Sequence, residues 1–179
     1  MPIVTTIEGR IAQVAIDRPE KRNTLSSELC KDLAREFLEL NDDTRVRSIV
    51  LCGHNNVFCA GLDIEEQLAE NTPIFNEFQK VIDALDALSK PVVAAVSGPA
   101  VSQGAAMLYH CDLVFAGEHA LFSMPGLALG QTPRYGVSLL AVKSGGYKLA
   151  AQKLLLSEPI SAAEAVAMGL VNHIVEEDT

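Results

Sequence analysis

The sequence has too few cations for a protein that binds nucleic acid. Its 14 Lys and Arg residues stand against 23 Asp and Glu residues, which gives a formal net charge of -9 at pH 7. Contacts to a phosphate backbone need clustered positive charge, so this composition argues against nucleic acid as a partner. The densest basic stretch near the N-terminus, Arg18 to Arg22, is either a site for a phosphate-bearing coenzyme or a solvated turn.

Metal-binding and disulfide motifs are also missing. The four cysteines form no C-x-x-C pair, and the four histidines form no H-E-x-x-H pattern. No metal is therefore expected. The cysteines have mostly apolar neighbours and are expected to be reduced and buried: Cys30, Cys52, Cys59 and Cys111.

A signal peptide and a membrane span are not expected either. Residues 1–10 alternate in polarity and carry a charge where a signal peptide would be apolar. Residues 91–111 lack Asp, Glu, Lys and Arg, but Pro99 and Gly104 would break a lipid-exposed helix near its middle. We expect a buried strand, a turn and a buried helix there, in a cytoplasmic protein without membrane contact.

Apolar residues make up 49% of the 179-residue chain, enough to bury the core of one domain covering residues 1–179. Strands are expected at residues 4–8, 11–16, 47–52, 92–96, 113–116 and 170–174. Helices are expected at residues 26–41, 74–88, 102–110 and 161–169. The first two strands flank Gly9 and predict a hairpin, whereas the later alternation of strands and helices predicts an α/β fold with a largely parallel sheet.

Two strand-to-helix junctions share one design, in which an apolar strand ends, small residues turn the chain and a helix begins. The first runs from Val57 to Ile64 and the second from Ser97 to Ala105. Helix starts leave backbone N–H groups free and carry the positive end of the helix dipole. Such junctions suit a developing oxyanion.

Five stretches resemble the crotonase family in order and spacing, and the resemblance spans nearly the whole chain. They are Ile16-Asp-Arg-Pro-Glu-Lys-Arg-Asn-Thr-Leu25, Phe58-Cys-Ala-Gly-Leu-Asp-Ile64, Lys90-Pro-Val-Val-Ala-Ala-Val-Ser-Gly98, Cys111-Asp112 and Ala162-Ala-Glu-Ala-Val-Ala-Met-Gly-Leu-Val171. The resemblance implies the repeated ββα spiral of the ClpP/crotonase fold. It also implies a protein that stabilises the enolate of an acyl-coenzyme A thioester with two backbone N–H groups.

Carried over by position, the two donors are the N–H groups of Leu62 and Gln103. The family commonly has glycine at the second position, so the Gln103 amide either adds a third donor or crowds the acyl group. The resemblance further implies a cleft for coenzyme A, which is part of the substrate and not a permanently bound cofactor. The cleft residues are Lys21, Arg22, Thr24, Ala60, Gly61, Asp63, Ile64 and Gly104. Asp63 is expected to cap the helix that follows it.

The sequence departs from the family's hydratases at both catalytic glutamates, whose positions hold Ala106 and Gly126. Residues 129–133 read like the motif of relatives that shift a double bond from the 3 to the 2 position, but Arg134 stands where those relatives have glutamate. General acid–base chemistry needs a titratable group near the reacting proton. Glu66 is one candidate base, and a solvated helix face is the alternative.

Arg134 and Tyr135 suggest a second chemistry. A guanidinium can orient a substrate carboxylate and a phenol can steady an enolate, which suits decarboxylation or hydrolysis of a malonyl-type thioester. The alternative is that Arg134 pairs with an acidic residue of its own chain or of a neighbouring subunit.

Three functions therefore remain open. The first is an isomerase-like enzyme of the enoyl-CoA hydratase/isomerase family, the second is a decarboxylase or hydrolase, and the third is a non-catalytic acyl-CoA-binding or assembly protein. The family's later helices, which close the acyl pocket and help to form trimers, are short or missing here. The resemblance implies a homotrimer or a hexamer, with apolar surface covered by partner chains.

Overall fold

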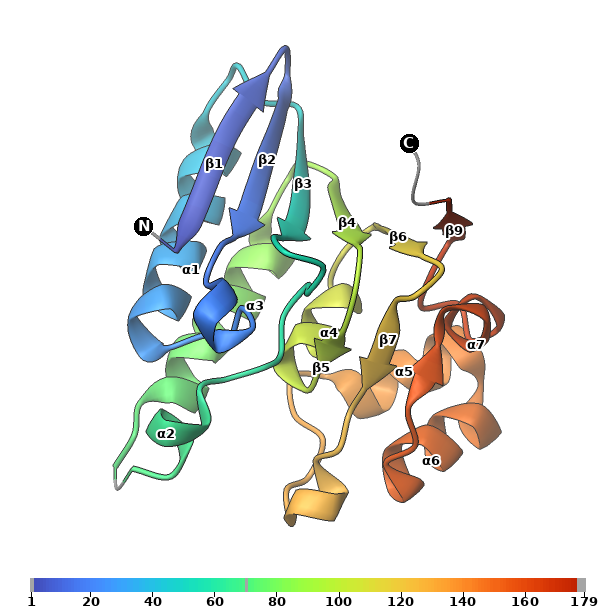
Figure 1. The fold of residues 1–179 in the computed structure, drawn as a ribbon. Coiled ribbons are helices and arrows are strands. Elements are labelled where there is room, and N and C mark those ends of the chain that lie inside the picture. Colours follow the sequence, from blue (N-terminus) through green and yellow to red (C-terminus); the bar gives the residue numbers. More distant parts are fainter. Residues whose placement is uncertain (1, 70, 177–179) are drawn as a thin grey trace.

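A computed structural model describes residues 2–69 and 71–176, in which two sheets are joined by helices (Figure 1). The larger sheet has the strand order β1-β2-β3-β4-β6-β9, and the smaller sheet has the order β5-β7-β8. The strands are β1 (Ile3–Glu8), β2 (Ile11–Ile16), β3 (Ser48–Gly53), β4 (Val92–Val96), β5 (Ala100–Val101), β6 (Leu113–Gly117), β7 (Leu121–Ser123), β8 (Ile160–Ser161) and β9 (His173–Val175). The α-helices are α1 (Ser27–Asp42), α2 (Ile64–Gln67), α3 (Ile74–Ala87), α4 (Gln103–Leu108), α5 (Val137–Gly145), α6 (Tyr147–Leu156) and α7 (Ala162–Ala167).

Strands β1 and β2 form the expected antiparallel hairpin, and every later neighbour in the large sheet pairs in parallel. Parallel neighbours need crossover connections, and helices supply them between β2 and β3, between β3 and β4, and between β4 and β6. This arrangement confirms the α/β class predicted from the alternation of elements.

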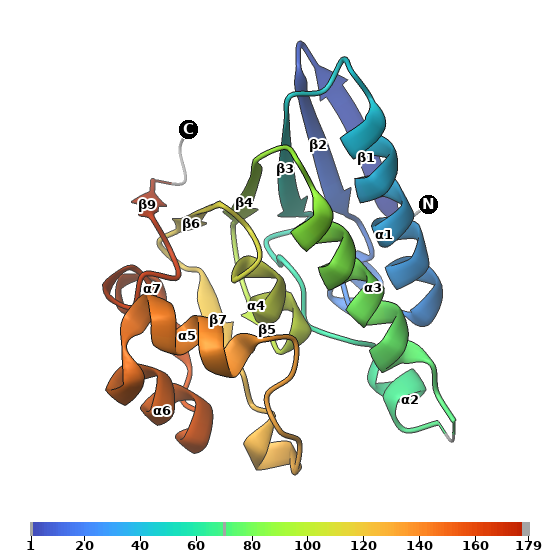
Figure 2. The ribbon, with the colours of Figure 1, turned by 180° about the vertical axis from the view of Figure 1, so that it is seen from behind.

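Helices α1 and α3 lie side by side and cover one face of the large sheet (Figure 2). The Ser26 side chain caps α1 by accepting a hydrogen bond from the Leu29 N–H. Leu33 and Phe37 of α1 and Phe78 of α3 are almost completely buried, as their helical spacing predicted. These two helices therefore cover the back of the large sheet with buried apolar side chains.

Helices α5, α6 and α7 lie next to the smaller sheet (Figures 1 and 2). Helix α7 begins with the predicted capping box, in which the side chains of Ser161 and Glu164 each bond the other residue's backbone N–H. The last strand begins at His173, three residues later than expected. Among residues 2–69 and 71–176, no helix has the length and apolarity needed to cross a membrane.

Candidate functional site

The two glycine-containing junctions lie next to each other in the structure. The N–H groups of Phe58 and Cys59 donate to the Pro99 carbonyl at 3.1 and 3.2 Å, and the Val101 N–H donates to the Cys59 carbonyl at 2.9 Å. Cys59 and Ala100 thus form a parallel bridge. Two segments about forty residues apart in sequence are fixed as neighbours by backbone hydrogen bonds.

Leu62 lies in the first junction. The backbone groups of the residues on either side of it form hydrogen bonds, but within the described residues its own N–H does not. The Gly61 carbonyl accepts from the Leu25 N–H, and the Asp63 N–H donates to the Leu25 carbonyl, both at 2.8 Å. Between these bonds, the Leu62 N–H has no hydrogen-bond partner among the described residues. Leu62 is only 3% exposed. A ligand that displaces water from its N–H must therefore offer an oxygen in return, because an unsatisfied buried donor is costly.

Gln103 is the first residue of α4, so its N–H has no partner within the helix. No other described residue accepts from it either. A Cβ atom at Gly61 would lie 3.2 Å from the Ser102 Cβ and 3.3 Å from the Gln103 Oε1, which places the turn before Leu62 against the start of α4. The structure therefore brings together the two segments that carry the predicted donors, and neither N–H has a partner among the described residues.

Ser102 adopts an unusual backbone conformation directly before this donor. Its φ is 54° and its ψ is -114°, which a residue with a Cβ rarely adopts and which costs about 1–3 kcal/mol. The Ser102 N–H donates to the Ser123 carbonyl at 2.7 Å, which holds the turn in place. Gly104 follows within the helix, where a Cβ would lie 2.3 Å from the Cys59 carbonyl oxygen. Only glycine allows this close approach of the two junctions.

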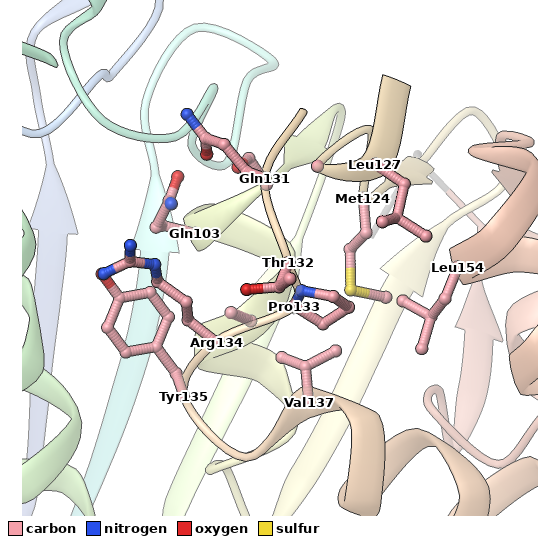
Figure 3. Close-up of a pocket in the computed structure, with 13 residues that line it drawn as sticks. Gln103, Met124, Leu127, Gln131, Thr132, Pro133, Arg134, Tyr135, Val137 and Leu154 are labelled. Atoms are coloured by element: carbon pink, nitrogen blue, oxygen red, sulfur yellow. The ribbon is translucent and has the colours of Figure 1, made fainter. Parts of the chain in front are cut away.

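A pocket that is partly open to solvent lies at the start of α4. Its lining residues are Ser102, Gln103, Ala106, Met124, Gly126, Leu127, Gln131, Thr132, Pro133, Arg134, Tyr135, Val137 and Leu154. Figure 3 shows the polar side chains Gln103, Gln131 and Arg134 on one side and Met124, Leu127 and Leu154 on the other. One side thus suits a polar group and the other an acyl chain.

None of these lining residues has a carboxylate or an imidazole. Both positions of the hydratase glutamates, Ala106 and Gly126, belong to the lining. The resemblance implies that these positions hold the acid and base in hydratases, and the lining residues supply no carboxylate in their place.

Gln103 contributes its side chain as well as its backbone. The residue is 7% exposed, and its Oε1 is buried with no hydrogen-bond partner among the described residues. This oxygen lies beside Gly61, within the first junction. Because an unpaired buried acceptor is costly, a donor from a ligand or water would stabilise it.

Arg134 rests on an aromatic ring. Its guanidinium carbon lies 4.8 Å from the centre of the Phe75 ring, and no described acidic residue forms an ion pair with it. The alternative that Arg134 pairs with an acidic residue is not observed in the described part of this chain. A guanidinium stacked on a ring keeps its N–H edges free for an anion.

Tyr135 is more constrained than the sequence suggested. Its hydroxyl donates to the Phe75 carbonyl at 3.3 Å, and its ring meets the Phe78 ring edge-on at 4.7 Å. Burial raises the pKa of Tyr135 to about 12. The phenol is therefore neutral, and its hydroxyl hydrogen is already bonded to a backbone carbonyl, which disfavours its predicted role in steadying an enolate.

Glu66 bonds the start of α1 and does not line the pocket. Its carboxylate accepts from the Ser27 N–H at 2.9 Å and from the Ser27 hydroxyl at 2.6 Å. It therefore satisfies a free N–H at the start of α1. Glu66 does not line the pocket, so its predicted role as a base is not supported by this geometry.

Apart from Gly104, which lies in α4, the residues expected to form the coenzyme cleft lie on two segments that contact each other. Arg18 pairs with Asp63 at 3.0 Å, and Lys21 pairs with Glu65 at 2.9 Å. The Glu65 hydrogen bond and charge raise the pKa of Lys21. Asp63 caps α2 by accepting from the Glu65 N–H at 3.1 Å, as expected. These ion pairs join residues 18–25 to residues 60–66.

The other residues expected in the cleft lie on the same two segments. The Ala60 N–H donates to the Arg22 carbonyl at 3.2 Å, and the Arg22 side chain is exposed. The Thr24 hydroxyl oxygen is buried and unpaired among the described residues. Ile64 is 60% exposed beside these polar groups, an apolar surface next to the basic segment.

Sequence patterns missed a second group of residues near the pocket. His110 contacts both Asp86 and the Tyr135 carbonyl, although these residues lie far apart in the sequence. No motif joins them, and only the packing of α3 against the end of α4 brings them together.

This arrangement defines an α/β protein in which two neighbouring backbone donors lack partners among the described residues, and one of them, Gln103, lines a pocket. The family model described as enoyl-CoA hydratase/isomerase matches residues 6–179. The chain belongs to the enoyl-CoA hydratase/isomerase family, and the fold predicted from the crotonase resemblance is confirmed.

Named relatives agree with this assignment. The chain is 35% identical to the short-chain-enoyl-CoA hydratase of Clostridium acetobutylicum, covering 97% of this chain and 69% of that protein. It is 32% identical to the 2,3-dehydroadipyl-CoA hydratase of Escherichia coli, with coverages of 98% and 70%. The solved enoyl-CoA hydratase/isomerase of Pseudoalteromonas atlantica superposes with a TM-score of 0.92 at 32% identity, covering 99% of this chain and 71% of that chain.

Proposed function

We propose that this protein binds an acyl-CoA thioester and stabilises its enolate with the N–H groups of Leu62 and Gln103. The observation that carries the proposal is that both donors lack a partner in the described fold, although their two junctions are neighbours and Gln103 lines the pocket. Such preorganised donors stabilise negative charge that develops on a carbonyl oxygen.

The reaction that follows enolate stabilisation depends on which group transfers a proton to or from the acyl chain. Hydration by two glutamates is disfavoured because Ala106 and Gly126 occupy the pocket wall. The isomerase-like double-bond shift, suggested by residues 129–133, removes a proton from C2 of the acyl group and returns one at C4. That reaction needs a titratable side chain within reach, and the lining residues other than Tyr135 and Arg134 offer none.

Decarboxylation of a malonyl-type thioester fits the same pocket with fewer requirements. The bond between the carboxylate carbon and the α-carbon breaks, its electron pair forms the enolate, and carbon dioxide leaves. The enolate then takes a proton from water and gives a shorter acyl-CoA. Arg134, the one charged residue in the lining, supports this reaction because its guanidinium can bind the carboxylate before it leaves.

A screen with 2-enoyl, 3-enoyl and malonyl-type CoA thioesters tests the proposal. We expect consumption of the malonyl-type thioester with release of carbon dioxide, and Arg134→Gln should lower this turnover by about tenfold to a hundredfold. Arg45→Gln is the matched control, since Arg45 is an exposed arginine paired with Asp43.

Each other outcome of the screen selects a different reaction. Conversion of the 3-enoyl to the 2-enoyl thioester would establish the isomerase-like reaction. Hydration of the 2-enoyl thioester at a rate unaffected by Arg134→Gln would contradict the argument from the missing carboxylates. Tight coenzyme binding without any product would identify the non-catalytic acyl-CoA-binding protein.

A further inference from the structure

His110 lies just after α4 and is wedged between two elements that come from different parts of the chain. Its side chain is 7% exposed. Its Nδ1 lies 2.8 Å from the Asp86 Oδ1 on α3, and its Nε2 lies 2.9 Å from the Tyr135 carbonyl oxygen. The ring therefore links α3 to the turn that carries two pocket-lining residues, Arg134 and Tyr135.

Both partners of the ring can only accept hydrogen bonds. A neutral imidazole has a single N–H and could satisfy one of them, whereas an imidazolium donates to both. The ring thus contacts the Asp86 carboxylate on one side and a peptide carbonyl on the other, and it is only 7% exposed between them.

The turn that His110 holds has an uncommon conformation. Tyr135 has a φ of 57°, in the left-handed region that side chains with a Cβ disfavour. Helix α3 contacts this turn at three further points: the Tyr135 hydroxyl bond to Phe75, the stack of Arg134 on Phe75, and the edge-on contact of the Phe78 and Tyr135 rings. Those contacts all involve side chains of the turn, whereas His110 Nε2 reaches the backbone carbonyl of Tyr135 itself.

We propose that His110 is a positioning residue, which with Asp86 fixes the Arg134–Tyr135 turn and so sets the pocket's affinity for an acyl group with a carboxylate. The inference about the ligand rests on the proposed function, because Arg134 is assigned there to the carboxylate. The inference about the turn rests on the contacts of His110 alone.

The test uses His110→Gln and Asp86→Ala, with His54→Gln as the control. Asp86 is 60% exposed, so Asp86→Ala removes one partner of the His110 ring with little loss of packing. His54 contacts Asp17 at 3.6 Å on the surface and lies outside the pocket lining. All variants are first checked by circular dichroism and thermal unfolding.

The first readout is the position of Tyr135, followed by ¹⁹F resonances of protein that contains 3-fluorotyrosine. The chain has three tyrosines, so Tyr→Phe variants assign every signal. We expect the Tyr135 signal to shift or broaden in both test variants, while the signal of Tyr147, which is 66% exposed, stays in place. An unchanged Tyr135 signal in two folded variants would overturn the inference.

The second readout is the dissociation constant of S-(2-carboxyethyl)-CoA divided by that of S-propyl-CoA, two unreactive thioethers that differ in the carboxylate. We expect the preference for the carboxylate to fall at least about threefold in both test variants and to stay the same in His54→Gln. A shifted Tyr135 signal together with an unchanged preference for the carboxylate would also overturn the inference. If the wild-type protein binds neither thioether, the proposed function fails, and the Tyr135 signal still decides whether His110 positions the turn.

Discussion

Replacing the backbone amide of Gln103 by an ester removes one hydrogen-bond donor and keeps the side chain. An α-hydroxy acid analogue of glutamine introduced at position 103 makes this change. The same replacement at Ala106, with lactic acid, is the matched control, because the Ala106 N–H donates to the Ser102 carbonyl at 2.9 Å. The two changes lie three residues apart and differ in whether the lost donor is used by the fold.

The structure predicts opposite effects at the two positions. The Gln103 N–H has no partner in the described fold, so the ester there should destabilise the fold less than the position 106 ester does, and only by weakening the Ser102 carbonyl as an acceptor for Ala106. Loss of an oxyanion donor costs about 2.7–4 kcal/mol of transition-state stabilisation, which lowers kcat by about 100-fold to 1,000-fold. The ester at position 106 should instead destabilise the fold by about 1 kcal/mol and leave kcat within about threefold.

The assay measures kcat on the thioester that the screen identifies, together with urea unfolding of each protein. A Gln103 ester that folds normally and keeps full turnover would refute the assignment of this N–H as an oxyanion donor. A Gln103 ester that unfolds as readily as the position 106 ester would show that the fold uses this N–H after all.

Three further changes test the surroundings of the site. Ser102→Gly should raise the free energy of unfolding by up to about 1 kcal/mol in a denaturant titration, because glycine adopts the positive φ without a Cβ penalty; a less stable variant would contradict the strain. Tyr135→Phe should be less stable than the wild-type protein by about 1 kcal/mol at neutral pH. The pKa of Tyr135 is raised from its ordinary value near 10 to about 12 in the fold, so this difference should shrink as pH rises from about 10 to about 12 in pH-dependent unfolding, and a constant difference would refute the assignment. Glu164→Gln should destabilise the protein, because the bonds from Lys153 and Ser161 hold the pKa of Glu164 at about 2; the wild-type advantage, present above about pH 4.5, should disappear as pH falls towards about 2, and its persistence there would count against these bonds.

Local patterns predicted the elements that surround the site. The hairpin was marked by alternation around Gly9, α1 by the Ser26 cap, and α7 by its capping box. Helices α5 and α6 were not predicted, because their apolar residues form no clear stripe and several leucines are exposed, such as Leu139 and Leu155. Their place follows from packing beside the small sheet and not from periodicity.

The site itself was predictable only in part. The two donors follow from the design of the junctions and the family resemblance, since a backbone N–H at a helix start is free for reasons that the sequence reveals. The partners of side chains are different, because they depend on long-range packing. Glu66 bonds Ser27, the Tyr135 hydroxyl bonds Phe75, and His110 bridges Asp86 and Tyr135 across separate elements. No local pattern indicates these contacts.

The infrared stretch of a bound thioester carbonyl tests the paired donors most directly, without requiring turnover. Acetyl-CoA labelled with ¹³C at its carbonyl separates this band from the protein amides in an isotope-edited difference spectrum. Two converging N–H groups should move the band to lower frequency in the complex, and the Gln103 ester should reverse much of that shift. A bound carbonyl that absorbs at the same frequency as free acetyl-CoA would contradict the account.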